Sequence, residues 1–498
     1  MELLGNLSLG AEVAFTATNL LHCFTGVFLG TVIGVLPGVG PLVTIAVLLP
    51  MTYGLTPESA LIMLAGIYYG AQYGGSTTAI LIRLPGESSS AVTCIDGYEM
   101  TRAGRGGPAL AIAAISSLIA GCIGTLLIAV FGPLLTKVGL SFGGAEYTSL
   151  LVMALVTTAA PSNSLLKGIG LALCGIIIGL VGIDVNSGTR RFTFDIPQLA
   201  AGIDFVVIAI GLFAFPEIIR NIEDPEEREI MKSKIGRLMP TREDVRRFFL
   251  PSLRGTGLGA FFGILPGTGP TISSFAAYML EKSISRTPSR FGKGAVEGVA
   301  APEAANNAAA QTAFIPTLSL GVPGSPTMAL MLGALMIHGI APGPNVVTDH
   351  PNLFWGLVVS MWIGNAMLVG LNLPLVGLWT AMLKLPYRWL YPLIIVLSSV
   401  GVYSLNLSEF EVIEAAVFGL LGYALMRLHC DPAPFILGFM LGPMLEENFR
   451  RALLVSGGDF TIFVSHPISL AFLLAALLIV AFMLVGRWFY TLPADNSR

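Results

Sequence analysis

The sequence predicts an all-α polytopic membrane protein of about 12 spans, built as two inverted repeats that each contain re-entrant or broken helices at Pro-Gly motifs. Hydrophobic residues make up 54% of the 498 residues and charged residues only 11%, whereas soluble domains carry about 25% charge. At roughly 20 residues per helical span, the chain has room for about a dozen spans. A glycine-rich string ending in Pro-Gly-x-Gly-Pro also occurs twice, once in each half of the chain.

Composition and motifs exclude several function classes. The net charge of -3 is small, and the five cysteines form no CxxC pair, so neither a disulfide framework nor a zinc site is predicted. No P-loop, HExxH or GxSxG string occurs, so we expect no enzyme, no cofactor and no direct use of ATP. No basic and aromatic stretch points to nucleic acid. The first Lys or Arg is Arg83, so we expect the first apolar segment to stay as an anchor rather than be cleaved as a signal peptide.

The first glycine string is GTVIGVLPGVGP at residues 30–41, where the long apolar segment of residues 11–36 ends. The apolar run that follows, residues 42–51, is too short to cross a bilayer comfortably. We therefore expect a descending segment and a short returning one to form a re-entrant or broken pair around the motif.

The second string is GAFFGILPGTGP at residues 259–270; seven of twelve positions are identical to the first, including every glycine and proline. A helix break at membrane depth is tolerated only where the freed backbone groups are buried in protein or line a cavity. Two breaks at corresponding places in two halves point to the binding site of a transporter. The alternative is that both motifs are tight turns between ordinary spans.

Each string is followed by a second Pro-Gly break. Residues 84–88 read LPGES after the small-residue-rich span of residues 60–84, and residues 322–326 read VPGSP. The sequence therefore predicts four breaks, two in each half.

Charge divides the chain and indicates its topology. The segment of residues 220–248 is rich in Lys and Arg, so the positive-inside rule places it in the cytoplasm. The second string lies between Arg254 and Lys282, whereas the first has no Lys or Arg on either flank. Such reciprocal charge predicts that the halves are inverted. The predicted parts are a first membrane repeat (1–219), a charged cytoplasmic linker (220–250), a second membrane repeat with additional C-terminal spans (251–486) and a cytoplasmic tail (487–498).

The breaks are the predicted substrate site. Exposed backbone N–H groups and helix N-termini attract carboxylates, and nearby hydroxyls and amides can add hydrogen bonds. The alternative for any one hydroxyl or amide is a helix–helix hydrogen bond. The candidate substrate-binding residues are Pro37, Gly38, Gly40, Pro41, Ser76, Thr77, Thr78, Arg83, Pro85, Gly86, Ser88, Gly267, Thr268, Gly269, Asn306, Asn307, Pro323, Gly324 and Ser325.

Carbonyls freed at a break, together with Ser, Thr and acidic oxygens, can coordinate a small cation. The candidate coupling-cation residues are Gly38, Thr44, Gly267, Thr271 and Glu303. No metal site is predicted beyond a possible transported sodium ion. Three ionisable residues allow more than one interpretation. Glu303 could serve a proton or cation, or be a helix-start carboxylate after Pro302. Arg83 could contact an anion or anchor the topology. Asp96 reads most simply as part of a turn in a cytoplasmic loop.

These strings occur in an order that resembles a known family. Residues 34–41 (GVLPGVGP), 73–78 (YGGSTT), 85–87 (PGE) and 96–100 (DGYEM) follow one another, and the resemblance continues through residues 266–270 and 323–325. The chain is similar to the large membrane subunit (TctA-like) of the bacterial tripartite tricarboxylate transporters.

The resemblance implies a multi-pass secondary transporter of the bacterial inner membrane, driven by a sodium or proton gradient. It also implies two partners, a small membrane subunit and a periplasmic substrate-binding protein, and substrates such as citrate and other small organic acids. The alternative from another class is a passive organic-anion channel, which would show a line of polar residues through several spans. A membrane-embedded enzyme would need a cleft of converging His and acidic residues.

Overall fold

The computed structural model describes residues 2–36, 39–159, 164–184, 186–223, 237–265, 269–383 and 387–491. Within these ranges the chain is helical apart from one two-stranded antiparallel pair, in which Gly182 lies opposite Arg191. Four of the described helices contain a stretch long and apolar enough to cross a membrane, namely α2, α6, α17 and α23. The predicted all-α membrane class is confirmed, while the number of spans and the inverted repeats stay predictions.

The chain folds into two compact units, and the first holds residues 1–139 and 205–423. Its elements before residue 140 are α1 (Glu2–Ala14), α2 (Ala17–Gly34), α3 (Pro41–Leu48), η1 (Leu49–Thr52), α4 (Pro57–Ile82), η2 (Ser88–Ala91), α5 (Thr93–Arg102) and α6 (Gly106–Gly139). Those after residue 204 are α9 (Phe205–Ala209), η4 (Ile210–Ala214), α10 (Phe215–Glu223), α11 (Arg242–Ile264), α12 (Gly269–Ile284), η5 (Pro288–Arg290), α13 (Glu297–Thr312), α14 (Phe314–Leu320), α15 (Pro326–Ile337), α16 (Asn345–Asp349), α17 (Pro351–Asn372), α18 (Val376–Met382), α19 (Tyr387–Asn406) and most of α20 (Glu409–Arg427), which continues past the end of this unit at Tyr423. Below, the first half means α2 to α6 and the second half α11 to α17.

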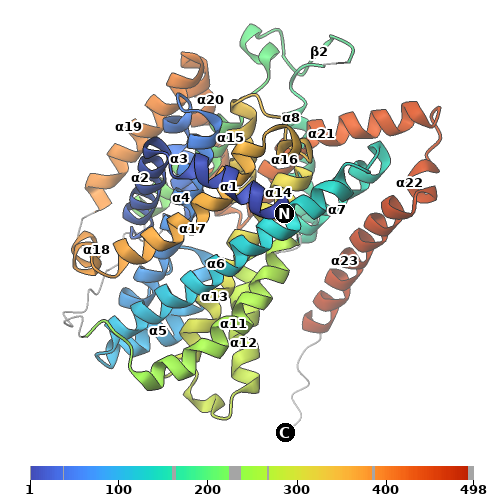
Figure 1. The fold of residues 1–498 in the computed structure, drawn as a ribbon. Coiled ribbons are helices and arrows are strands. Elements are labelled where there is room, and N and C mark those ends of the chain that lie inside the picture. Colours follow the sequence, from blue (N-terminus) through green and yellow to red (C-terminus); the bar gives the residue numbers. More distant parts are fainter. Residues whose placement is uncertain are drawn as a thin grey trace. The chain divides into compact units, whose positions relative to one another are not determined.

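The glycine string of the first half packs α2 directly against α4 (Figure 1). A Cβ placed on Gly30 would lie 2.3 Å from the carbonyl oxygen of Ile67, and one on Gly34 would lie 2.4 Å from that of Ala71. Glycines four residues apart share one helix face, and only glycine lets two backbones approach this closely. Because contact positions rise together along both helices, α2 and α4 run parallel.

The second string repeats this packing between α11 and α13. A Cβ on Gly259 would lie 2.2 Å from the carbonyl oxygen of Ala305, and one on Gly263 would lie 2.4 Å from that of Ala309. These two helices are therefore parallel as well, so α12 must bring the chain back between them, as α3 does in the first half. Helix α11 begins at Arg242, inside the range predicted as a linker.

The returning helices begin where the sequence breaks each glycine string. Helix α3 starts with Gly40 as its N-cap and Pro41 in its first turn. A proline is tolerated there because backbone N–H groups in the first turn have no partner within the helix. With 8 residues it is about 12 Å long, less than half of a hydrocarbon core of about 30 Å. Helix α12 starts at Gly269, whose φ of 53° is a left-handed conformation that glycine adopts easily.

The second unit comprises residues 140–204 and 424–498. Its elements are α7 (Gly144–Ala159), α8 (Leu165–Gly179), β1 (Gly182–Ile183), β2 (Arg190–Arg191), η3 (Pro197–Ala201), α21 (Ala433–Val455), α22 (Ile462–Ser465) and α23 (Pro467–Thr491). Helix α21 packs on α8 and α7. Asp184, in the loop that joins β1 to β2, pairs with Arg450 of α21 at 3.1 Å, and this ion pair fastens the loop to the helix.

Candidate functional site

The second Pro-Gly break of each half lies at the end of the glycine string of the same half. A Cβ on Gly86 would lie 2.3 Å from the Cα of Gly75 and 3.3 Å from the carbonyl oxygen of Gly34. One on Gly324 would lie 3.5 Å from the carbonyl oxygen of Gly263. The last carbonyls of α2 and α11, which have no partner within their own helix, therefore face these breaks.

The breaks of the two halves also meet each other. The hydroxyl oxygen of Ser88, beside the second break of the first half, lies 2.8 Å from that of Thr271 in the first turn of α12. In the other direction, α15 of the second half packs against α3 and α4. The two halves thus meet at Ser88 and Thr271, which the sequence analysis assigned to the substrate and the cation respectively.

Four candidate residues, Pro37, Gly38, Gly267 and Thr268, lie outside the described residues. Their described neighbours Gly40, Pro41 and Gly269 begin the returning helices. Gly40 lies close to the second break, because a Cβ on it would be 3.3 Å from the carbonyl oxygen of Gly86. Ser325 caps α15, accepting a hydrogen bond from the N–H of Met328 at 3.2 Å. Pro85 and Pro323 precede the two break glycines.

A buried polar cluster joins α4, α5 and α13 beneath the breaks. Ser76 donates a hydrogen bond to Glu303 at 2.8 Å, and Thr93 donates to the other oxygen of that carboxylate at 2.5 Å. Glu303 is 1% exposed. Among the residues that the structure describes, no Lys or Arg forms an ion pair with it. A buried carboxylate without a cationic partner is costly, which makes this residue a candidate for a functional role.

Asn306 extends the cluster to the break loop. Its side-chain amide donates to Glu87 at 3.2 Å, and Gln72 of α4 donates to its oxygen at 3.4 Å. Glu87, Gln72 and Thr93 were not among the predicted residues. Glu87 follows Pro85-Gly86 directly, so its position beside the break was a usable signal. Gln72 and Thr93 could be identified only from the structure, which shows their hydrogen bonds to Asn306 and Glu303.

Several predicted residues hold the helices together or bond within their own helix. Asn307 donates to Ser117 of α6 at 2.7 Å, which is a helix–helix hydrogen bond. Thr77 and Thr78 donate to the carbonyls of Tyr73 and Gly75. Thr44 donates to the carbonyl of Gly40 at 2.9 Å. Within the described part of the chain, no hydrogen bond links Thr44 or Thr271 to Glu303.

Two interpretations of ionisable residues were wrong. Glu303 is not a helix-start carboxylate, because α13 begins six residues earlier at Glu297 and continues through Pro302. Asp96 does not lie in a turn, since it belongs to α5 and is 0% exposed. Helix α5 consists largely of small and polar residues and packs against α13 of the second half. Its sequence has no hydrophobic pattern that would distinguish a helix from a loop.

Arg83 is the left-handed C-cap of α4, with a φ of 61°. Its exposed guanidinium lies over the ring of Tyr98, 5.8 Å from the centroid. Both of its possible roles, anion contact and topology anchor, fit this position next to the break.

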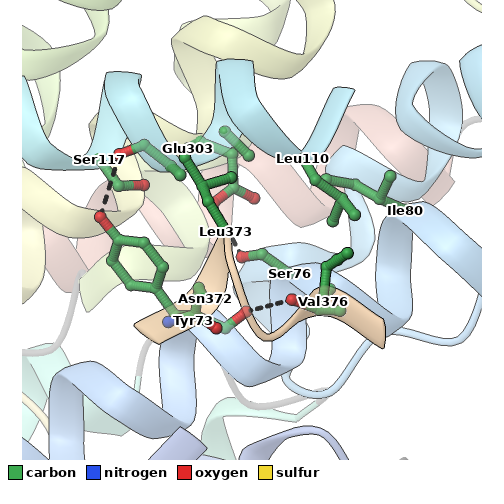
Figure 2. Close-up of a pocket in the computed structure, with 12 residues that line it drawn as sticks. Tyr73, Ser76, Ile80, Leu110, Ser117, Glu303, Asn372, Leu373 and Val376 are labelled. Carbon is green, nitrogen blue, oxygen red and sulfur yellow. Dashed lines mark hydrogen bonds between the residues drawn. The ribbon is translucent and has the colours of Figure 1, made fainter. Parts of the chain in front are cut away.

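A small cavity lies beside Glu303. Its volume is about 20 Å³, and its polar lining comes from Tyr73, Ser76, Thr77, Ser117, Glu303 and Asn372 (Figure 2). The apolar lining comes from Ile80, Leu110, Ala113, Ala114, Leu373 and Val376. The candidate site therefore has two parts, the four Pro-Gly breaks and a buried polar cavity beside Glu303.

The family model described as "Tripartite tricarboxylate transporter TctA family" matches residues 20–437. An Agrobacterium vitis protein described as "Uncharacterized 52.8 kDa protein in TAR-I ttuC' 3'region" is 53% identical over 486 residues, covering 97% of each chain. A second protein of that organism, "Uncharacterized protein in TAR-II ttuC' 3'region", is 56% identical over 215 residues, which is 43% of this chain and 89% of that protein. No solved structure matches the chain.

Proposed function

The chain belongs to the tripartite tricarboxylate transporter TctA family, and we propose that it is the membrane-spanning transport subunit of a binding-protein-dependent secondary transporter. In this proposal it imports tricarboxylates or related small organic acids, citrate among them, in symport with sodium or protons. Its surroundings are the bacterial inner membrane, which it crosses about 12 times as two inverted repeats. Its partners are a small membrane subunit and a periplasmic substrate-binding protein.

The contact between Ser88 and Thr271 carries this proposal. It joins the second break of one half to the returning helix of the other at 2.8 Å. Separate tight turns between ordinary spans have no reason to meet in this way. Breaks that build one site must meet, because their freed backbone groups need either each other or a ligand.

Substrate carboxylates fit the groups gathered there. The N-termini of α3, α12 and α15 lie at the breaks, and each carries unpaired N–H groups and a positive partial charge. Arg83 adds a full positive charge at the end of α4. Such a site binds an anion with few charged side chains, which suits a chain with only 11% charged residues.

The passive-channel alternative is supported less well. A channel needs polar groups along a continuous path, whereas Ser76, Glu303 and Asn306 are 5%, 1% and 1% exposed. Ser76 bonds to Glu303, and Asn306 bonds to Glu87 and Gln72, so these side chains have protein partners rather than an open pore. Catalysis is not part of the proposal, because the family is one of transporters.

The test is uptake into proteoliposomes that contain this chain and its small membrane subunit, with the binding protein outside. Labelled citrate and related acids are supplied with a sodium gradient, a proton gradient or neither. We expect gradient-dependent, saturable uptake and counterflow. Uptake without saturation or gradient dependence would favour a channel, and no uptake of any organic acid would contradict the proposal.

A matched pair of variants tests the breaks. In Gly86→Ala the added methyl would meet the Cα of Gly75 at 2.3 Å, whereas in Gly104→Ala nothing lies within 4 Å. Because Gly104 has a φ of 75°, alanine there adds backbone strain without crowding a neighbour. We expect Gly86→Ala to abolish uptake and Gly104→Ala to retain it. Equal uptake by well-expressed Gly86→Ala protein would mean that the break is only a turn.

A further inference from the structure

Side chains that carry oxygen atoms line part of the cavity beside Glu303 and come from four helices; apolar side chains line the rest. Tyr73 and Ser76 come from α4, Ser117 from α6, Glu303 from α13 and Asn372 from the last turn of α17 (Figure 2). The first three belong to the first half and the last two to the second half. Its volume of about 20 Å³ accommodates one water-sized species and nothing larger.

Asn372 has a side-chain oxygen that no described group satisfies. The residue is 6% exposed, and its amide nitrogen donates to the carbonyl of Leu368 at 2.9 Å. Its Oδ1 is buried and without a hydrogen-bond partner in the structure. Buried polar atoms of this kind are rare in native proteins and call for an explanation. A ligand in the cavity that is coordinated by this oxygen would explain why the oxygen has no hydrogen-bond partner.

Three of the four hydroxyl groups around the cavity already donate their protons elsewhere, and the fourth, that of Ser117, accepts a hydrogen bond from Asn307 at 2.7 Å. Ser76 donates to Glu303 at 2.8 Å, Thr77 to the carbonyl of Tyr73 at 3.1 Å, and the Tyr73 hydroxyl to the carbonyl of Ala114 at 3.1 Å. For Tyr73, Ser76 and Thr77, the groups left for a bound species are therefore oxygen lone pairs. A water molecule can donate to only two of these oxygens, whereas a hard cation can be coordinated by all of them. The lining therefore suits a cation better than a water molecule.

Charge and donor type narrow the identity of the cation. Glu303 is the one carboxylate among the lining residues, and a buried charge requires a compensating one. A single negative charge is balanced by a monovalent ion, and an all-oxygen shell suits a hard cation rather than a transition metal. We propose that this cavity binds one sodium ion, coordinated by the carboxylate of Glu303, the side-chain oxygen of Asn372 and the hydroxyl oxygens of Tyr73, Ser76 and Ser117.

Such an ion links the two halves, because its ligands come from both. Assigning the ion to the transport cycle rests on the proposed function, but its binding does not. Among the residues already predicted for the cation, only Glu303 lies in this cavity. The inference thus places the ion among helices α4, α6, α13 and α17 rather than at the Pro-Gly breaks.

The test is equilibrium binding of ²²Na⁺ to the purified chain in detergent, by scintillation proximity, without substrate or partner subunits. Wild-type protein is expected to bind one sodium ion per chain and Glu303→Gln none. Asn372→Leu removes the unpartnered oxygen at similar volume. We expect it to raise the half-saturating sodium concentration about 10-fold or more while leaving the melting temperature unchanged or higher, since it removes a buried unsatisfied group.

The matched control is Asn365→Leu. This asparagine lies on the same helix, is 0% exposed, and both polar atoms of its amide lack a partner, but it does not line the cavity. Sodium affinity should be unchanged. The double variant Glu303→Gln, Asn372→Asp restores one carboxylate to the cavity and should recover sodium binding that Glu303→Gln loses, provided that both proteins are folded.

Three results would overturn the inference: no ²²Na⁺ binding by the wild type, wild-type affinity in Asn372→Leu, or a divalent cation that displaces ²²Na⁺ at a lower concentration than unlabelled sodium does. The outcomes separate this inference from the proposed function. Gradient-driven uptake without sodium binding rejects the site and keeps the transporter. Sodium binding that depends on Asn372, in a chain that transports no organic acid, keeps the site and rejects the transport proposal.

Discussion

The carboxylate of Asp96 on α5 accepts a hydrogen bond from the backbone N–H of Ala295 at 2.7 Å. The same oxygen accepts from the N–H groups of Gly292 and Gly294, and the other accepts from the Tyr278 hydroxyl at 2.9 Å. One side chain of the first half thus organises the connection between α12 and α13 in the second. This contact could not be predicted from the sequence, because the two segments lie 199 positions apart.

Asp96→Ala should destabilise the fold strongly. It leaves buried N–H groups without an acceptor, and hydrogen bonds to a charged group contribute more than neutral ones, so we expect a loss of about 3 kcal/mol. Thermal unfolding in detergent measures it. The matched control is Glu99→Ala on the same helix, whose ion pair with Arg102 is partly exposed and contributes about 0.5 kcal/mol. Equal melting temperatures for the two variants would contradict this role of Asp96.

Gly259→Ala should separate α11 from α13. The added methyl would lie 2.2 Å from the carbonyl oxygen of Ala305, and overpacking of this kind costs about 1–3 kcal/mol. On the same helix Gly257 faces open space, with nothing within 4 Å of an added Cβ. Gly257→Ala should therefore keep or slightly raise the melting temperature, because alanine favours helix. A similar loss in both variants would mean that the glycines matter only for backbone flexibility.

Arg83→Gly separates the two possible roles of that residue. Glycine adopts the observed φ of 61° more easily than arginine, so the fold should be kept or stabilised by about 1 kcal/mol. If the guanidinium contacts the substrate, the KM for uptake rises and Arg83→Lys recovers part of the affinity. We expect this result. An unchanged KM, together with an altered orientation in the membrane, would assign Arg83 to topology instead.

The contact between Ser88 and Thr271 can be measured by a double-mutant cycle. Ser88→Ala and Thr271→Val each remove one hydroxyl, so their effects on unfolding should be non-additive by about 0.5–1.5 kcal/mol. Ser283, also on α12, donates to the carbonyl of Leu280 within its own helix. Ser88→Ala combined with Ser283→Ala should be additive. Additivity of the first pair would mean that the two breaks do not meet in the folded protein.

The loop at Asp184 predicts a pH effect in the second unit. Hydrogen bonds from the Ser187 hydroxyl, the Asn186 N–H and Arg450 hold the pKa of Asp184 at about 2, below its ordinary value of 3.8. Since the folded pKa is the lower one, the stabilisation is complete above the ordinary value and is lost as the pH falls toward about 2. Wild type should melt above Asp184→Asn at neutral pH, and the difference should shrink through that range. A constant difference would show that the charge is not responsible.

Much of the architecture was predictable because it depends on local chemistry. Low charge indicated a membrane protein, and the repeated glycine strings indicated two similar halves with close helix contacts. Gly30 and Gly259 do pack against backbone, as small residues at fixed spacing imply. Glu303 could be named as a candidate residue because a lone acid in an alanine-rich segment is conspicuous in any membrane sequence.

The partners of these residues could not be predicted, since spacing along a chain says little about neighbours from another helix. Asn372 carries no motif, and it became relevant only because α17 ends beside Glu303. Asp96 was misread for the same reason, because its acceptor role depends on backbone N–H groups of a distant loop.

The sequence by itself determined that the chain is a helical membrane protein of the transporter type, with a helix break at each repeated Pro-Gly motif. Glycine, proline and charge act through the local backbone and the bilayer, so their effects can be predicted without the fold. Only the tertiary structure decided that Ser88 meets Thr271, and that Glu303 and Asn372 share one cavity. Such contacts join helices from both halves, and their distances depend on how every intervening helix packs.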